Sequence, residues 1–432
     1  MKGGKVRTLF AFCLLLILAV PVFAGVEIEN QDNSSIEGVV RLPEFEQVSV
    51  GGYTKLSFDM AGSYNEEARP DIPILSILVA IPTSTGGEVE ILDTDYEDIP
   101  INIDTWAPVP DDAGNLYRDE KFYSEFSTYP TSIAKTGNVG ILREFRVLPV
   151  SFVGVQLIRE KHIARVYKSI HFRIRLTGST SPVSNCVSES YIPLYRALVA
   201  NYDIVSSTRL VRRGGYLIIS KGVFIPYLDE LIFWKERKGF PCTVFDLDED
   251  IGGGTTPSKE EIKEFIRSYY NDADIPPEFL LLVGDVQMGS YGSFPDYTYH
   301  SSYEEGDYAS DYGYSAIVGD DYLPDIAVGR LTVDTPSELR TVVAKIVGYE
   351  SNPYMDDRYW FRRALSIGAN CCGSPNPTSP RLVALWTRDL LLESGFTRVD
   401  TVTCIGTICS HDYTYISSLI CLLYTSPSPR DS

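Results

Sequence analysis

The sequence predicts an all-β, sandwich-like domain followed by an α/β domain in which helices flank a parallel sheet. Three observations support this prediction. Residues 25–207 contain short apolar or alternating segments separated by Gly, Pro, Asn and Ser, which is typical of strands joined by turns. After Tyr216, strand patterns alternate with helical patterns, and this order favours a parallel sheet with crossover helices. A short basic linker, residues 208–215, separates the two regions.

The first 24 residues have the layout of a secretory signal peptide. Three cations precede an apolar run from Leu9 to Val20, and a small-residue end at Ala24 stands before Gly25. The alternative, a membrane anchor, would need about 20 apolar residues to span the bilayer, and this run is shorter. We therefore expect an exported protein, secreted or held at the cell surface, that engages a secretion machinery and has no transmembrane span in its mature chain.

Candidate strands of the first domain follow one another without helical periodicity. They are Val39 to Leu42, Lys55 to Asp59, Ile74 to Ile81, Gly140 to Pro149 and His171 to Leu176. The linker that follows carries Arg209, Arg212 and Arg213 just before a Gly-Gly pair. An exposed basic segment between domains is a plausible site of proteolytic processing, although a plain connecting linker would have the same composition.

The α/β domain is expected over residues 216–420. Ser258 and Thr335 stand where helices should begin, and each is followed by glutamates that favour a helix N-terminus, while Gly395 suits a helix end. Strands are predicted at residues 216–220, 243–247, 279–285, 326–330, 363–370 and 398–404, and helices at 227–238, 258–270, 336–350 and 381–394.

Two of these strands frame an acidic, aromatic loop. Leu280 to Val283 is a short apolar run that ends in Gly284-Asp285, and Ile326 to Arg330 repeats the arrangement after Asp325. Runs of this kind suit parallel strands that are covered on both faces. Open α/β sheets bind ligands at the carboxyl ends of such strands, so the sequence predicts a functional site in this loop.

The charge of the chain is strongly negative. Formal net charge is −20, and the chain from Gly25 onward carries about −23 because the signal holds three cations and no acids. Nucleic acid is an unsuitable partner, since phosphate binding requires clustered Lys and Arg. The acids concentrate between Asp296 and Asp325, where carboxylate oxygens are the donors that calcium prefers. A solvated acidic surface is the alternative, and no EF-hand spacing is present.

The seven cysteines outside the signal are Cys186, Cys242, Cys371, Cys372, Cys404, Cys409 and Cys421. Cys404 and Cys409 are close enough to bridge across a turn, whereas the adjacent Cys371 and Cys372 would form a strained pair. Zinc binding is not expected, because no second pair or histidine cluster has ligand spacing.

Several motifs in order resemble the catalytic domain of the gingipain family of cysteine peptidases, peptidase family C25. They are VGD at residues 283–285, SDYGYSAIVGDD at 310–321, PDIAVGRL at 324–331 and the helix ELRTVVAKIVGYESNP at 338–353. The resemblance covers roughly Tyr216 to Cys404. It implies a caspase-like α/β fold, a propeptide in the place of residues 25–207, protein or peptide substrates, and structural calcium. The candidate calcium ligands are Asp307, Asp311, Asp320 and Asp321. Neighbouring acids include Asp285, Asp296, Glu304 and Glu305.

The catalytic pair of such a peptidase is not identified in this chain. A cysteine peptidase needs a thiolate activated by a neighbouring imidazole, and the four histidines are His162, His171, His300 and His411. The resemblance places the catalytic His in a Gly-His-Gly turn and the catalytic Cys on a later strand, and neither segment occurs here. His411 with Cys409 is therefore rejected as the family's dyad. Asn370-Cys371-Cys372 stands where arginine-specific members carry a carboxylate that orients the histidine.

The C-terminal segment, residues 421–432, differs in character from what precedes it. Its Ser-Pro run breaks a helical pattern and resembles the translation of a sequencing adapter. We expect residues 421–432 to be adapter-derived and the peptidase domain to be truncated, the alternative being a genuine Ser/Pro tail.

The sequence thus predicts an exported gingipain-like cysteine endopeptidase precursor whose fragment lacks the catalytic His and Cys. Two alternatives remain open. One is a type IX secretion sortase of the same family, and the other is a non-enzymatic surface-binding protein with a degenerate peptidase fold.

Overall fold

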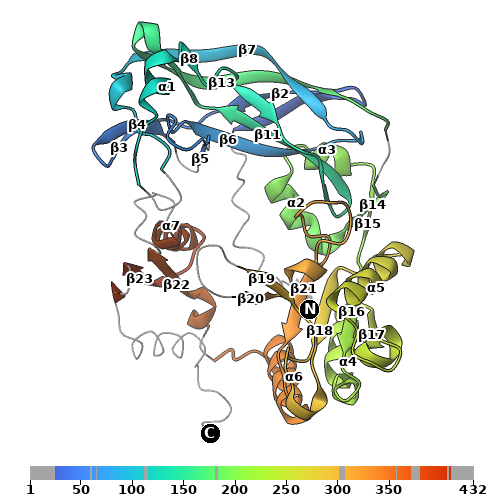
Figure 1. The fold of residues 1–432 in the computed structure, drawn as a ribbon. Helices are drawn as coiled ribbons and strands as arrows, with labels where there is room; N and C mark the ends of the chain where they lie inside the picture. Colours follow the sequence, from blue (N-terminus) through green and yellow to red (C-terminus); the bar gives the residue numbers. More distant parts are fainter. Residues whose placement is uncertain are drawn as a thin grey trace, which may run out of the picture.

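The computed structural model describes residues 25–58, 61–64, 66–110, 115–180, 183–300, 307–356, 358–370, 380–405 and 408–409. Figure 1 shows an N-terminal β-rich domain, an α/β domain with a parallel sheet, and a smaller C-terminal unit. The predicted signal peptide, residues 1–24, and the predicted adapter-derived tail lie outside the described residues. Among the helices of the described part, none is long and apolar enough to cross a membrane.

The N-terminal domain contains two antiparallel sheets. The first has the order β1 (Val26–Gln31), β2 (Ser35–Arg41), β13 (Ile163–Leu176), β12 (Val155–Ile158) and β8 (Thr128–Tyr129), with β7 (Gly87–Pro100) also paired to β13. The second has the order β10 (Gly140–Leu142), β11 (Phe145–Val153), β6 (Pro73–Ala80) and β5 (Gly62–Ser63), with β9 (Ala134–Thr136) paired to β11. A hairpin of β3 (Glu46–Val50) and β4 (Tyr53–Ser57) and the short helix α1 (Glu120–Glu125) complete it.

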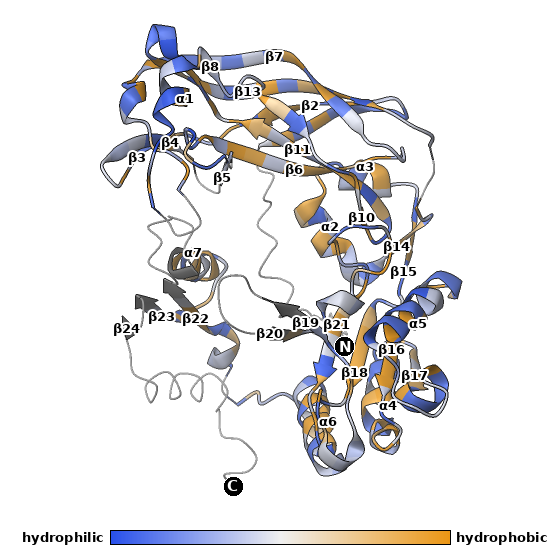
Figure 2. Ribbon diagram, viewed as in Figure 1, coloured by the Kyte–Doolittle hydropathy of each residue, from blue (hydrophilic) through white to orange (hydrophobic). Residues whose placement is uncertain are grey.

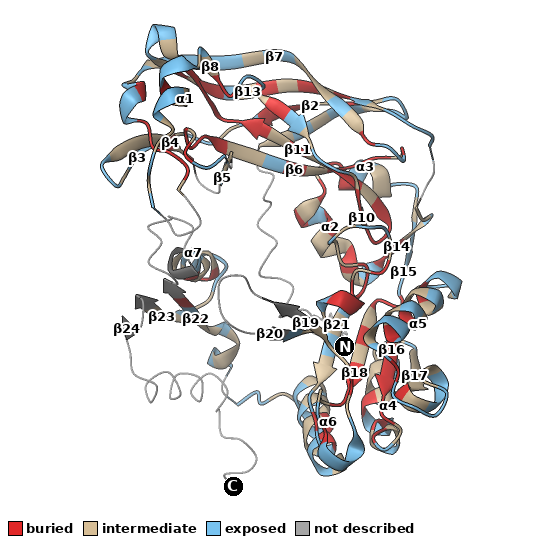
Figure 3. Ribbon diagram, viewed as in Figure 1, coloured by how far each residue is buried: buried red, intermediate tan, exposed pale blue. Residues whose placement is uncertain are grey.

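The two sheets share a buried core. Successive strand side chains point to opposite faces, so alternate residues of β6, β11 and β13 are buried, as Figure 3 shows in red. Phe152 of β11 and Phe172 of β13 meet with ring centroids 4.9 Å apart, and Ile77, Val150 and Ile170 pack around them. This apolar contact holds the two sheets together.

The segment between the domains is partly helical. Helices α2 (Ile192–Leu198) and α3 (Tyr202–Ser206) lie against the second sheet, and β14 (Cys186–Ser188) pairs in parallel with β15 (Leu210–Arg212). The predicted basic linker therefore contains a short strand. Figure 1 shows these elements between the β-rich domain and the α/β domain.

The α/β domain has a four-stranded parallel sheet. Its order is β17 (Cys242–Asp246), β16 (Tyr216–Ser220), β18 (Phe279–Val283) and β21 (Ala327–Leu331). Helices α4 (Asp229–Arg237), α5 (Lys259–Asp272) and α6 (Pro336–Ser351) connect or follow these strands. The predicted helix starts are confirmed: Ser258 with Glu261, and Thr335 with Glu338, each form a capping box.

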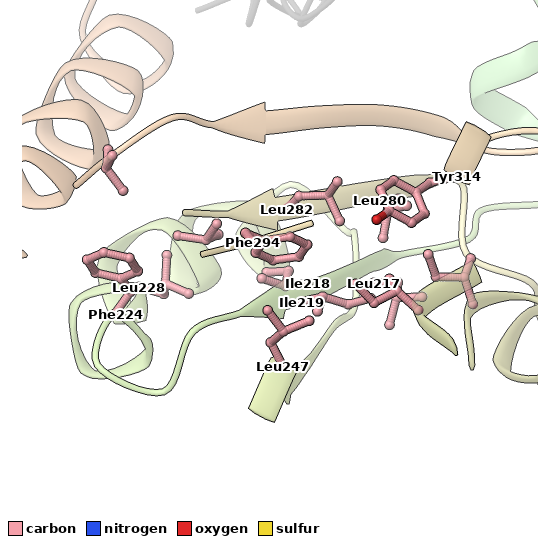
Figure 4. Close-up of a cluster of buried hydrophobic side chains, with 14 of the residues drawn as sticks. Leu217, Ile218, Ile219, Phe224, Leu228, Leu247, Leu280, Leu282, Phe294 and Tyr314 are labelled. Carbon is pink, nitrogen blue, oxygen red and sulfur yellow. The ribbon is translucent and has the colours of Figure 1, made fainter. Parts of the chain in front are cut away.

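The core of this domain covers both faces of the central strands. Leu217, Ile218 and Ile219 are all buried although they are consecutive, because helices and loops cover each face of a parallel sheet. Figure 4 shows them with Leu280 and Leu282 of β18. In Figure 2, β16 and β18 are correspondingly among the most hydrophobic segments.

The C-terminal unit contains β22 (Arg363–Asn370) and β23 (Arg398–Ile405), which pair in parallel, with β24 (Ile408–Cys409) antiparallel to β23. Helix α7 (Pro380–Glu393) packs on this pair, and Ser366 Oγ donates to the carbonyl of Ala384 at 2.8 Å. The predicted helix end is confirmed at Gly395, which has a φ of +96°. The backbone register places Cys404 opposite Cys409, and a disulfide between them stays a prediction.

Candidate functional site

The carboxyl ends of β16 and β18 meet at one edge of the parallel sheet, as the sequence predicts. Lys221 directly follows β16 and is only 3% exposed. Its Nζ donates to both carboxylate oxygens of Asp248, at 2.7 and 2.9 Å, and to Oγ1 of Thr256 at 2.7 Å. All three donor positions of the ammonium are thus used, and the residue ties the segment after β17 to the end of β16.

The acidic, aromatic loop is attached to the sheet through Arg330 of β21. Its Nε and Nη2 donate to the two carboxylate oxygens of Asp311, at 2.8 and 2.6 Å. Nη1 donates to the carbonyl of Gly284 at 2.9 Å, and Nη2 to that of Pro295 at 3.2 Å. The guanidinium lies 4.6 Å from the ring centroid of Phe294. One planar group therefore connects three points of the loop.

Aromatic packing also holds the segment around Tyr314 in place. Tyr314 is fully buried and its hydroxyl donates to the carbonyl of Pro295 at 2.8 Å. Its ring meets that of Tyr297 edge-on at 5.0 Å. Gly313 lies directly beneath Tyr297, where a Cβ would fall 2.4 Å from the ring, so only glycine permits this approach.

Beside this edge, a hollow of about 250 Å³ lies between the end of β21 and the first turns of α6. It is lined by Thr332, Val333, Ser337, Glu338, Thr341 and Val342. Most of its polar side chains, those of Ser337, Glu338 and Thr341, belong to the first turns of α6.

Two of the four candidate calcium ligands, Asp311 and Asp321, have different partners in the structure. Asp311 is paired with Arg330 through both oxygens, whereas Asp321 accepts backbone N–H groups from Ile141 and Leu323, each at 2.8 Å. Asp320 is exposed. Asp307 begins β20 (Asp307–Ser310), opposite His300 of β19 (Tyr297–His300).

Within the described residues, no group of three or more His, Cys, Asp or Glu side chains is arranged to hold a metal ion. Glu304 and Glu305 lie outside those residues. The described donors do not fit calcium as they stand, because Arg330 and backbone amides already occupy the oxygens of Asp311 and Asp321. Calcium at this loop stays a prediction, which melting with Ca²⁺ against EDTA would test.

A second group of acids lies at the opposite edge of the sheet, where β18 and β21 begin. Asp325 is fully buried, and its Oδ2 accepts N–H groups from Ile317 and Val318 at 2.8 and 2.7 Å. Burial raises its pKa to about 6. Glu278 is also fully buried, and burial raises its pKa. The sequence predicted neither residue as part of a buried cluster, although an acid beside an apolar run was a visible signal for both.

Within the α/β domain, the cysteine whose side chain the structure describes, Cys242, does not have the properties of a catalytic thiol. Cys242 lies in β17, where its Sγ is 3.5 Å from the carbonyl of Phe240 and burial raises the pKa of the thiol to about 11. This shift is opposite to the activation of a thiolate. His162 and His171 lie in the N-terminal domain, and His411 lies outside the described residues.

Lys221 and Arg330 were not identified from the sequence as organising residues of the site. A cation at the end of an apolar strand, within an acidic region, is the signal that would have indicated each of them. Arg143, in the N-terminal domain, gave no such local signal.

Two family models match the chain, in the order of its two main domains. The model for the C25 propeptide matches residues 26–188, and the model for peptidase family C25 matches residues 210–398. Gingipain R2 of Porphyromonas gingivalis (strain ATCC BAA-308 / W83) is 24% identical over 361 residues, which cover 80% of this chain and 46% of that protein. Lys-gingipain HG66 of Porphyromonas gingivalis is 24% identical over 363 residues, covering 77% of this chain and 20% of that protein.

The chain thus spans less than half the length of these curated relatives. Among solved structures, the complex of RgpB pro- and mature domains from Porphyromonas gingivalis aligns with a TM-score of 0.36 and 20% identity, over 42% of this chain and 98% of that one. The Arg-specific cysteine proteinase gingipain R aligns with a TM-score of 0.37 and 22% identity, over 44% of this chain and 41% of that one. On the two family models, the chain belongs to peptidase family C25, with a propeptide region ahead of its gingipain-like cysteine peptidase region.

Proposed function

We propose that the protein is an exported precursor of a cysteine endopeptidase, in which the N-terminal domain is the propeptide and the α/β domain begins the catalytic unit. The observation that carries this proposal is the tandem match of the C25 propeptide and peptidase models, the first ending at residue 188 and the second beginning at residue 210. The parallel strand order β17-β16-β18-β21 supports a caspase-like arrangement of the second domain.

The proposed reaction is hydrolysis of peptide bonds in protein substrates. A cysteine thiolate would attack the carbonyl carbon, and a histidine would transfer its proton to the departing amine, leaving an acyl-enzyme. Water, deprotonated by the same histidine, would then release the acyl group. Neither role is assigned to a described residue, and burial raises the pKa of the Cys242 thiol, which opposes its use as the nucleophile.

The described residues of the α/β domain would hold the backbone around the proposed active site in position. Lys221 and Arg330 fix the backbone at the carboxyl edge of the sheet, where open α/β sheets bind their ligands. The hollow between β21 and α6 lies at the same edge. A peptide substrate crossing this edge is the arrangement that the fold favours.

Export is a proposal that rests on the sequence of the first 24 residues. Mass spectrometry of protein secreted by a bacterial host tests it. We expect an N-terminus at Gly25, and an N-terminus that retains the run from Leu9 to Val20 would indicate a membrane anchor.

The function is tested on the product of the complete gene, recovered by amplifying source DNA across the codon for Ile420. Hydrolysis of a fluorogenic peptide library, abolished by alanine at a newly revealed cysteine, is the expected result. Transfer of the acyl group to an added amine in preference to water would identify a sortase. A complete gene product without a Cys–His pair and without hydrolysis would favour the surface-binding alternative.

A further inference from the structure

The turn between β10 and β11 presents a buried arginine from the N-terminal domain to the α/β domain. Arg143 and Glu144 form this two-residue turn, and Arg143 is only 2% exposed. Its φ of +52° lies in the left-handed region, which costs a non-glycine residue conformational energy and favours Gly or Asn in hairpin turns. An arginine at such a position indicates that its side chain makes contacts that offset the strain.

Those contacts are backbone carbonyls at the entrance to two strands of the parallel sheet. Nη1 of Arg143 donates to the carbonyls of Pro277 and Asp325, at 3.0 and 2.5 Å, and Nη2 donates to that of Pro276 at 3.1 Å. Pro276 and Pro277 precede β18, and Asp325 precedes β21. The guanidinium therefore bridges neighbouring strands across the domain boundary.

The remaining sides of the guanidinium are enclosed as well. Nε donates to Glu144 at 2.7 Å and to Oγ of Ser188 at 2.8 Å. The ring of Tyr270, from α5, and that of Tyr191 lie 5.3 and 4.8 Å from the guanidinium carbon. Aromatic faces at these distances attract a cation.

The α/β domain also supplies buried acids around this point. Glu278 and Asp325 are fully buried beside the carbonyls, and the positive charge of Arg143 lowers the pKa of Glu278 against the rise caused by burial. The backbone N–H of Arg143 likewise lowers the pKa of Asp325. Asp321 accepts the N–H of Ile141, in the strand before the turn, at 2.8 Å.

We propose that the amino-terminal edge of the parallel sheet is a binding site for an arginine side chain, which Arg143 fills within the same chain. The site consists of the carbonyls of Pro276, Pro277 and Asp325 and the ring of Tyr270, with the carboxyl group of Glu278 near enough for the charge of Arg143 to act on it. It lies at the sheet edge opposite the one that would carry catalysis. The proposal goes beyond the peptidase function and holds whether or not the complete protein hydrolyses peptides.

The arrangement selects a guanidinium over an ammonium. Nη1 donates to a carbonyl before each of the two strands, Nη2 donates to a third carbonyl, and Nε donates to Glu144 and Ser188. All three nitrogens of one planar group are thus used, a geometry that the compact ammonium of lysine does not reproduce. If the side chain were removed, three carbonyls would lose a donor and the buried carboxylate of Glu144 would lose its counter-ion. Such unsatisfied buried groups destabilise the fold.

Chemical rescue tests the site on the whole chain. Arg143→Ala should lower the Tm, and N-ethylguanidinium at a concentration several-fold above its Kd should raise the Tm of this variant by about 2–4 °C. Ethylammonium, which has the same charge, should not. Equal responses to the two cations would overturn the proposal.

Two matched proteins serve as controls for the rescue. The wild type has its site filled, and Arg175→Ala removes a surface arginine of β13 whose side chain is 64% exposed. Neither should respond to N-ethylguanidinium. A Tm rise in either control equal to that of Arg143→Ala would mean a nonspecific effect of the ligand and would contradict the proposal.

A second variant separates the side chain from the turn. Arg143→Gly relieves the left-handed backbone, so it should raise the Tm if the guanidinium contributes nothing. We expect a lower Tm than that of the wild type, and a rise would refute the site. If either variant does not fold unaided, its yield of folded protein on dilution from urea should increase with N-ethylguanidinium, and an unchanged yield would equally refute it.

Discussion

Arg330 and Asp311 form an ion pair through two parallel hydrogen bonds, with Nη2–Oδ1 and Nε–Oδ2 distances of 2.6 and 2.8 Å. The arginine side chain is 7% exposed and the aspartate side chain 21%. The pair connects the last strand of the parallel sheet to the far end of the loop that begins at Gly284. The loop conformation therefore depends on one charged contact that water reaches only in part.

Replacing one member of this pair should lower the free energy of unfolding substantially. Arg330→Leu leaves Asp311 without its counter-ion and the carbonyl of Gly284 without the donor that Arg330 supplies, while the carbonyl of Pro295 keeps only Tyr314 as a donor. We expect a loss of about 3 kcal/mol in the free energy of unfolding, the lower end of the range for breaking a buried pair, measured by urea denaturation. Arg330→Lys should recover only part of this loss, because lysine cannot make both bonds.

An exposed ion pair provides the control. Arg41 and Glu27 have side chains that are each 59% exposed, and Arg41→Leu should cost no more than about 1 kcal/mol. A double-mutant cycle on Arg330 and Asp311 should give a clear coupling energy. Additive single-variant effects would show that the pair does not hold the loop.

Asp325 should make the stability of the fold depend on pH. Its pKa of about 6 in the folded chain exceeds the ordinary value of 3.8 because the carboxyl group is buried. The folded state therefore binds this proton more tightly, so the contribution of Asp325 to stability is complete below pH 3.8 and is lost as pH rises through about 6.

Asp325→Asn removes this titration while keeping an oxygen that can accept a backbone N–H. Between about pH 4.5 and about pH 7.5, the difference in unfolding free energy should move in favour of the variant, by about 2 kcal/mol. Urea denaturation at several pH values measures it. A difference that stays constant across this interval would mean that Asp325 does not titrate there.

Limited proteolysis should distinguish the three arginines of the linker. Arg209 donates to the carbonyl of Glu144 at 2.9 Å and lies over Phe145, and Arg213 is paired with Glu189 at 2.8 Å. Arg212 is exposed in a strand whose other residues, Leu210 and Val211, are 62% and 58% exposed.

We therefore expect trypsin to cut the linker first between Arg212 and Arg213, since proteases bind extended, accessible segments. Arg212→Gln should slow this cleavage strongly, and Arg209→Gln should leave it unchanged. Mass spectrometry of the early fragments identifies the bond. Earlier cleavage after Arg209 would show that its packing against Phe145 does not protect it.

The chain of 432 residues should not hydrolyse peptides, with or without a reductant. Cys242, whose pKa is raised to about 11 by burial, is almost entirely a thiol at neutral pH. A fluorogenic peptide library measures the activity. Hydrolysis that disappears in Cys409→Ala or His411→Ala would contradict the prediction and restore that pair as a candidate dyad.

Local patterns in the sequence determined most secondary-structure elements of the α/β domain. The apolar run at residues 216–220 became β16 with the predicted bounds, and the segment predicted at residues 279–285 became β18, which ends at Val283. Consecutive apolar residues suit strands covered on both faces. The capping boxes at Ser258 and Thr335 involve residues three positions apart. Such features depend on near neighbours alone, so the sequence displays them directly.

Tertiary structure alone decided which charged residues meet. The sequence indicated a single segment from Gly140 to Pro149, but the structure turns at Arg143, whose partners lie at Pro276, Pro277 and Asp325. Asp311 and Asp321 are close in sequence, yet one pairs with Arg330 and the other with the backbone of Ile141. Their partners are distant in the chain, and only the packing of the domains brings these groups within hydrogen-bonding distance and excludes the water that would otherwise compete for them.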